Sequence, residues 1–230
     1  MLNFNTVKES GKALLDIFYP NICQVCSVSL VTGEKFICIK CFFDLPFLEP
    51  NQETMSQLQK RFWGRVEVDQ VYSLLDYQKG KTTQSLLHEI KYKGKKKLGE
   101  YLGELLGEQI DSLYDFIIPV PLHKKKQRHR GYNQSEIIAN GICRIIDVPI
   151  NINCLKRTHY SRSQTRFTRF DRWENVTDIF ALSQIDKVKN KKVLLVDDVL
   201  TTGATLESAA RKLLEIEGVK LSIATIAIRV

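Results

Sequence analysis

The sequence predicts an α/β protein in which a mostly parallel sheet carries helices on both faces and follows a small four-cysteine module. Residues 193–196 form a short apolar run, as expected of a strand buried on both faces, and residues 206–214 then have helical apolar spacing. Residues 116–122 form a second apolar run, which precedes a predicted helix at 136–146. Four of the six cysteines stand in two Cys-x-x-Cys pairs ahead of these units.

Two acids and a turn of small residues connect the first strand to its helix. Asp197 and Asp198 follow the apolar run, at the strand's carboxyl end, where ligands of α/β sheets bind. The turn offers backbone N–H groups and hydroxyls at the positive end of a helix dipole, and consists of Thr201, Thr202, Gly203, Ala204 and Thr205. This order predicts a phosphate site whose carboxylates suit ribose hydroxyls or Mg²⁺.

Two other kinds of structure could account for this stretch. An apolar strand ending in two acids is also typical of a Walker B element, but the chain has no G-x-x-x-x-G-K-[ST] segment to accompany one. An ordinary strand–helix turn that binds no ligand is the remaining alternative.

Positive charge is concentrated in a few segments. The 230-residue chain has a formal net charge of +8. Residues 91–97 include five lysines, residues 124–130 include five lysines or arginines, and residues 156–172 are also basic. Such clusters fit a polyanionic ligand, either a phosphorylated small molecule or nucleic acid.

The loop after the strand at 116–122 is the candidate for holding a diphosphate. It reaches the same sheet edge as the two acids, and arginine suits bidentate phosphate contact while lysine adds charge. A solvated run of charge is the alternative. The candidate residues are Lys124, Lys125, Arg128, Arg130, Gly131, Asn133 and Gln134, with Asn133 or Ser135 as the cap of the following helix.

Residues 158–173 mix basic and aromatic side chains, which suits unpaired bases because rings stack on bases while charge follows the backbone. A loop that covers the sugar-phosphate site explains the pattern equally well. The candidate nucleic-acid contacts are Lys91, Lys93, Arg162, Arg166, Phe167 and Arg169.

Cys23, Cys26, Cys38 and Cys41 have the spacing of two metal-binding turns. Each Cys-x-x-Cys turn presents two thiolates to one side, and four close a tetrahedral Zn²⁺ site with no open position, so the site is expected to be structural. Disulfides or free thiols are the alternatives, and disulfides are disfavoured in a reducing cytosol. No apolar run could span a membrane and no secretory signal is recognisable, so a cytoplasmic location is expected.

The remaining elements follow from periodicity and turn residues. An N-terminal helix (5–18) and the cysteines form a first module at 1–45, a polar Pro-containing linker runs over 46–68, and the α/β domain occupies 69–230. Within that domain we expect a strand at 66–77, helices at 82–92 and 95–110, and a last strand at 219–229.

Residues 193–205 resemble the phosphoribosyl-diphosphate (PRPP) signature of type I phosphoribosyltransferases, with Gly203-Ala204 where many members have Gly-Gly. The chain also resembles the ComF family over residues 18–229. The matching motifs are the four cysteines, residues 91–94, 119–122 and 130–134, Gln164, Arg172, Asn175-Val176 and the PRPP signature.

The resemblance implies a zinc finger joined to a type I phosphoribosyltransferase fold. Asp197 and Asp198 would hold the ribose 2′- and 3′-hydroxyls as the catalytic acids, residues 201–205 with Leu200 would hold the 5′-phosphate, and Mg²⁺ would accompany PRPP. Family members are implicated in handling incoming single-stranded DNA, which implies DNA and a DNA-uptake helicase as partners.

Three functions fit these observations. The first is a DNA-handling protein on a phosphoribosyltransferase scaffold. The second is an active phosphoribosyltransferase whose acceptor the sequence does not name. The third is a PRPP sensor without catalytic activity.

Overall fold

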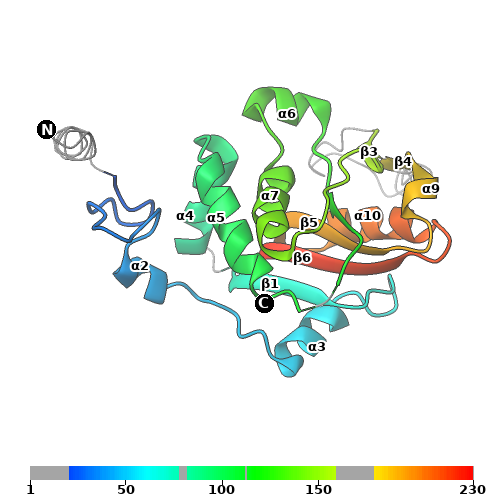
Figure 1. The fold of residues 1–230 in the computed structure, drawn as a ribbon, viewed down its shortest axis with the longest axis horizontal. Coiled ribbons are helices and arrows are strands. Elements are labelled where there is room, and N and C mark those ends of the chain that lie inside the picture. The colour runs from blue at the N-terminus through cyan, green and yellow to red at the C-terminus, as the bar shows by residue number, and fades with distance from the viewer. Residues whose placement is uncertain (1–20, 78–81, 112, 159–178, 230) are drawn as a thin grey trace, which may run out of the picture.

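The computed structural model of the protein describes residues 21–77, 82–111, 113–158 and 179–229. At its centre lies a four-stranded sheet in the order β1-β6-β5-β2, with every neighbouring pair parallel (Figure 1). The strands are β1 (Val71–Asp76), β2 (Phe116–Pro119), β5 (Lys192–Leu200) and β6 (Lys220–Ile228). The predicted parallel sheet is confirmed.

Helices cover both faces of this sheet. On one face, α4 (Thr82–Tyr92), α5 (Lys96–Gly107) and α7 (Gln134–Ile146) share a buried apolar cluster with Leu194 and Val196. On the other, α10 (Ala204–Leu214) shares a second cluster with Val193 and Leu195. Successive strand side chains point to opposite faces, and all four of these are fully buried. The central strand β5 is therefore held by apolar contacts on both sides.

The backbones of α5 and α7 touch through glycines. A Cβ on Gly103 would collide with the carbonyl oxygen of Ile138, and a Cβ on Gly141 with the carbonyl oxygen of Glu100. Larger residues would force the two backbones apart. This contact fixes the position of α7, whose first turn contributes to the site described below.

Strand β5 is longer than the sequence indicated. The apolar run ends at Val196, but pairing with β6 continues through Asp197–Thr225 and Leu200–Ile228. The two acids therefore lie within the last part of the strand rather than after it. Pairing with a long, apolar neighbour overrides the local change to polar residues.

The segment expected to be a polar linker is largely structured. Near its start, the Leu48 N–H donates to Leu74 O (3.0 Å) and the Asp76 N–H donates to Pro46 O (2.9 Å), so the chain covers the free edge of β1. It then forms α3 (Gln52–Lys60), whose N-cap Asn51 accepts a hydrogen bond from Thr54 N–H. Phe62, which follows α3, is buried in the second cluster.

The basic loop after β2 contains a helix that the sequence did not predict. In α6 (Lys124–Arg130) no residue is buried, so no apolar face marks it. Its ends define it instead: the His123 ring accepts from Lys125 N–H, and Gly131 closes the helix with a left-handed backbone, φ 78°.

Short elements complete the described chain: α2 (Ile39–Phe43), the antiparallel pair β3 (Leu155–Arg157) and β4 (Phe180–Leu182), and α9 (Ile185–Val188). Among the described residues, no helix has the length and apolar character needed to cross a membrane. The expected helix at 5–18 and most of the basic–aromatic stretch, with Arg162, Arg166, Phe167 and Arg169, lie outside the described residues.

Candidate functional site

Asp197 is held by the first turn of α7. Its Oδ1 accepts hydrogen bonds from the Ser135 hydroxyl and from the Asp198 N–H, each at 2.9 Å. The turn itself is fixed to the end of β2, because Asn133 Nδ2 donates to Val120 O (3.0 Å) while Asn133 Oδ1 accepts from Ser135 N–H (3.2 Å). The carboxyl ends of β2 and β5 thus meet at one polar site.

Asp198 forms an ion pair with Lys91. The Lys91 Nζ lies 2.9 Å from Asp198 Oδ2, and both side chains are mostly buried, at 21% and 13% exposure. Lys93, the other lysine predicted to contact nucleic acid in this segment, pairs with Glu89 at 2.7 Å and is 59% exposed. The structure therefore brings Lys91 to the acid pair and leaves Lys93 at the surface.

The turn at residues 201–205, predicted to hold a phosphate and called the phosphate loop below, is open to solvent. Thr201, Thr202 and Ala204 are exposed, and Gly203 has the left-handed backbone (φ 81°) that directs the chain into α10. Gly203 is the N-cap of α10 and offers no side chain to its free amides. N–H groups, hydroxyls and the N-terminus of α10 therefore lie together at an exposed turn.

The residues predicted to hold a diphosphate divide into two groups. Lys124, Lys125 and Arg128 are exposed on α6. Asn133 and Gln134 are each only 2% exposed, and Asn133 acts as the predicted helix cap.

Arg130 and Gly131 lie between these two groups, at the end of α6. The Arg130 guanidinium donates to Gln134 Oε1 (2.8 Å) and to the Tyr92 hydroxyl (3.3 Å), and its centre lies 5.0 Å from the Tyr92 ring centroid. The end of α6 is thereby tied to the end of α4.

Ser135 and Arg157 belong to this site although the sequence analysis assigned them no contact there. Burial lowers the pKa of the Arg157 guanidinium, and the negative charge of Asp197 opposes that shift. Arg157 also lies over the Phe180 ring at 5.4 Å, and its buried Nε has no hydrogen-bond partner among the described residues. Arg157 lies in β3, a strand of three residues that is too short for a sequence pattern to reveal. Ser135 is predicted from sequence only as a possible cap of α7.

Asp197 has an unusual affinity for protons. Burial and the charge of Asp198 raise its pKa to about 7, while the hydrogen bonds from Asp198 N–H and Ser135 and the charge of Lys91 oppose this increase. An acid pair that is costly to ionise favours partners that supply positive charge or hydroxyl donors. A divalent cation and ribose hydroxyls both fit this requirement.

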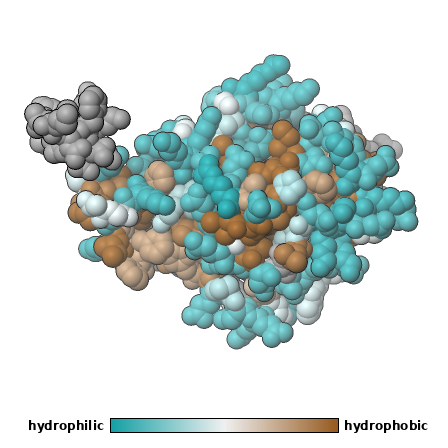
Figure 2. Space-filling view, in the orientation of Figure 1, coloured by the Kyte–Doolittle hydropathy of each residue, from teal (hydrophilic) through white to brown (hydrophobic). Residues whose placement is uncertain are grey.

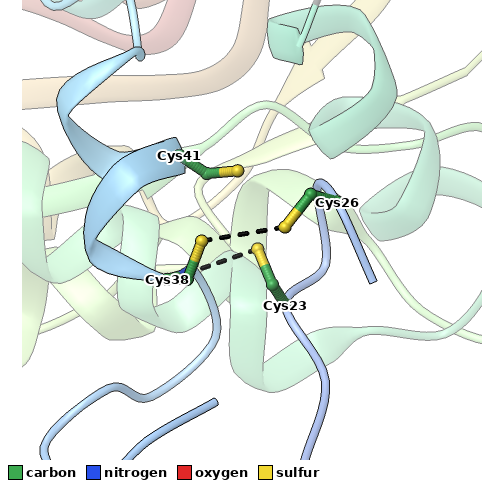
Figure 3. Close-up of side chains that lie close together, drawn as sticks. All are labelled: Cys23, Cys26, Cys38 and Cys41. Carbon is green, nitrogen blue, oxygen red and sulfur yellow. Dashed lines mark hydrogen bonds between the residues drawn. The ribbon is translucent and has the colours of Figure 1, made fainter. Parts of the chain in front are cut away.

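Four thiols cluster in the N-terminal part of the described chain (Figure 3). Their sulfurs, from Cys23, Cys26, Cys38 and Cys41, all lie within 4.8 Å of one another, and Cys26 Sγ is 3.7 Å from Cys38 Sγ. Tetrahedral ligands at the zinc–thiolate distance of about 2.3 Å would be about 3.8 Å apart. The cluster therefore fits a metal ion bound by four thiolates.

Backbone amides stabilise negative charge on one of the four thiols, Cys23, whereas burial and the neighbouring thiols raise the pKa of Cys41. Burial opposes ionisation of Cys23, but N–H groups of the Cys26, Cys38 and Val25 backbone outweigh it and lower the pKa of the thiol to about 6. Two of these contacts, from Val25 N–H and Cys38 N–H to Cys23 Sγ, measure 3.4 and 3.3 Å. A ligating thiol must be deprotonated, so the surroundings of Cys23 suit a metal ligand.

The fold and the phosphate loop define the class of the C-terminal domain. Residues 133–229, which include α7, β5, the acid pair and the loop, match the family model described as "Phosphoribosyl transferase domain". The domain has the type I phosphoribosyltransferase fold.

Several curated proteins are similar to all or part of this chain. Competence protein F of Haemophilus influenzae is 38% identical over 103 residues, which cover 44% of this chain and 45% of that protein. Competence protein ComFC of Bacillus subtilis is 30% identical over 99 residues, covering 43% of this chain and 38% of that protein. DNA utilization protein YhgH of Escherichia coli K12 is 27% identical over 202 residues, 84% of each chain. The chain is thus similar to competence and DNA utilization proteins, and it spans less than half the length of the first of them.

Among solved structures, glutamine PRPP amidotransferase from Bacillus subtilis superposes on 59% of this chain and 30% of its own, with a TM-score of 0.41 and 19% identity. Purine phosphoribosyltransferase from Pyrococcus horikoshii covers 57% of this chain and 71% of its own, with a TM-score of 0.34 and 22% identity. Both superpositions are partial.

The raised pKa of Asp197 predicts a pH-dependent stability. Because the folded state holds this proton more tightly than the unfolded state, where the ordinary value is 3.8, the stability that the proton contributes is present at low pH and is lost as pH rises through about 7. Asp197→Asn cannot ionise but can still accept from Ser135. Measured without added Mg²⁺ or ligand, its Tm should exceed that of the wild type at about pH 8, and the difference should shrink at about pH 5.

The exposed acid Asp186 on α9 supplies the control. For Asp186→Asn we expect no comparable change with pH. A difference for Asp197→Asn that stays constant from about pH 5 to pH 8 would show that this acid does not titrate in the range.

Proposed function

We propose that this protein binds PRPP with Mg²⁺ at the carboxyl end of β5 and single-stranded DNA on an adjoining basic surface, in a DNA-uptake role. The observation that carries the first part is the acid pair beside an open, glycine-capped turn. The DNA role is supported by relatives whose names refer to competence and DNA utilization.

The acid pair would recognise the ribose. Carboxylate oxygens of Asp197 and Asp198 accept hydrogen bonds from the 2′- and 3′-hydroxyls, while the loop amides and the hydroxyls of Thr201, Thr202 and Thr205 hold the 5′-phosphate. Ser135 fixes the orientation of Asp197 through its 2.9 Å hydrogen bond. Mg²⁺, when bound, supplies charge that offsets the diphosphate.

Two lysine- and arginine-bearing regions supply further positive charge. Lys91 neutralises Asp198 and lowers the repulsion that an anionic ligand meets there. The diphosphate would face α6, with Arg130 and Gly131 at its end and the cations Lys124, Lys125 and Arg128 along it. In a transfer reaction, Asp197 and Asp198 would stabilise positive charge developing at ribose C1.

Calorimetric titration of the full chain with Mg²⁺ and PRPP tests this site. Asp198→Asn removes one hydroxyl acceptor and leaves Lys91 without its partner, so PRPP affinity should fall by about tenfold or more. Asp186→Asn, which also removes one acid, should bind as the wild type does. Wild-type affinity in Asp198→Asn would contradict the proposal.

An assay for diphosphate release, run beside the titration, separates the alternative functions. Release of diphosphate in the presence of a nucleobase would identify an active phosphoribosyltransferase, whose acceptor the base then indicates. Binding of PRPP without diphosphate release would instead favour a sensor or a DNA-handling protein.

We propose that the four cysteines bind one structural Zn²⁺. The purified chain should contain about one zinc per molecule, and Cys38→Ser should lose the metal and unfold at a lower temperature. Cys143→Ser, which changes a cysteine outside the cluster, should keep it. A folded wild type without metal would exclude the assignment.

The basic surface proposed for DNA centres on α6, which is teal at the top of Figure 2 and has five lysines or arginines among its seven exposed or partly exposed residues. A hollow of about 480 Å³ lies between the cysteine module and the start of α5. Its lining includes Lys35, Lys95, Lys96 and Lys97. Exposed cations along two neighbouring elements suit the phosphates of a single strand.

Fluorescence anisotropy with a labelled oligonucleotide tests this surface. Replacing Lys124, Lys125 and Lys126 with alanine should weaken binding and lower the slope of log K against log salt by up to about 2, because each phosphate contact contributes about 0.7. The control removes the same charge at the opposite end of the strands, as Lys187→Ala/Lys189→Ala/Lys220→Ala. Equal losses in both variants would show a general effect of charge rather than a binding face.

We propose a cytoplasmic location and a DNA-uptake helicase as a partner, on the strength of the family. None of the six cysteines forms a disulfide, which is consistent with a reducing compartment.

A further inference from the structure

The phosphate loop has no cation of its own. Residues 201–205 include no lysine or arginine, and the first turn of α10 adds an acid, Glu207. Amides and the helix dipole attract a phosphate dianion, but a carboxylate in the same turn repels it. A source of positive charge from another part of the chain would remove this conflict.

Two arginines after α3 lie against the loop. A cavity of about 200 Å³ is lined by Thr202, Gly203 and Leu200 on one side and by Arg61, Phe62 and Arg65 on the other. Phe62 is 1% exposed and shares the second apolar cluster with Leu200. The chain here forms a hydrogen-bonded turn, since the N–H groups of Arg65 and Val66 both donate to Phe62 O. Packing therefore holds the arginines at the mouth of the loop.

Arg65 forms an ion pair with Glu207. Its Nη1 lies 3.1 Å from Glu207 Oε2, and the other carboxylate oxygen accepts from Arg211 Nη2 at 2.8 Å. Arg65 Nη2 also donates to the carbonyl oxygen of Arg61. The repulsive carboxylate is thus neutralised by two arginines, one from outside the helix.

The guanidinium of Arg61 differs from that of Arg65 in its bonding partners. Arg61 lines the cavity and is partly buried, yet its guanidinium makes no ion pair and no hydrogen bond within the described part of the chain. A guanidinium carries five donors in a planar fork that matches phosphate oxygens. An arginine beside the phosphate loop whose guanidinium has no ion pair or hydrogen bond among the described residues is placed to bind the anion.

We propose that Arg61 binds the phosphomonoester of the sugar phosphate held by the loop, and that Arg65 is a positioning residue that neutralises Glu207. This inference rests on the proposed function, because the ligand is the one assigned to the loop. Arg61 and Arg65 lie outside the residues that match the phosphoribosyltransferase domain, which begin at residue 133. The proposed phosphate contact therefore comes from another part of the chain.

Calorimetric titration of the zinc-loaded full chain with ribose 5-phosphate, without Mg²⁺, tests Arg61 directly. Arg61→Ala and the milder Arg61→Gln should each weaken binding by about 10- to 100-fold, the range for one lost charge-assisted contact. The control is Lys60→Ala, one residue away, whose Nζ lies 5.8 Å over the Trp63 ring. It should bind as the wild type does.

A double-variant cycle tests Arg65. Arg65→Ala leaves Glu207 less neutralised and should weaken binding, whereas Arg65→Ala/Glu207→Gln should restore most of the affinity because the repulsive charge is gone. A residue that only supported the fold would not be rescued by Glu207→Gln.

The outcomes separate this inference from the proposed function. A wild type that binds neither PRPP nor ribose 5-phosphate overturns both. A wild type that binds them, with Arg61→Ala and Arg61→Gln equally tight, overturns only the role of Arg61.

Discussion

The site depends on the parallel placement of β5 between β6 and β2. Parallel strands end at the same edge, so the acids of β5, the turn after β2 and the start of α10 are delivered together. Four fully buried side chains hold β5 from both faces. Without that fixed strand, neither the Ser135–Asp197 hydrogen bond nor the Lys91–Asp198 ion pair could form.

Two adjacent carboxylates in a partly buried position are costly, and the surrounding chain reduces that cost in different ways. Ser135 and the Asp198 N–H donate to Asp197, Lys91 pairs with Asp198, and Arg157 adds positive charge nearby. The raised pKa of Asp197 shows that compensation is incomplete. A stable fold that keeps such a pair retains a strong attraction for cations and hydroxyl donors.

The sequence predicts those features that depend on near neighbours. Apolar periodicity located β5, α7 and β6, and Cys-x-x-Cys spacing located the thiol cluster. It does not predict pairings between distant segments: Ser135 and Asp197 are 62 residues apart, and nothing near Lys91 indicates Asp198. The helix α6 was missed because its ends, rather than an apolar face, define it.

The segment between the cysteines and the sheet shows why composition misleads about structure. Its polar residues suggest a tether, yet Pro46 and Leu48 cover the edge of β1 and Phe62 packs in the core. Since Cys41 is itself buried in the first cluster, the chain from the thiols to Arg65 is in contact with the sheet at several points. The apolar side chains of this segment, rather than its polar ones, therefore decide its structure.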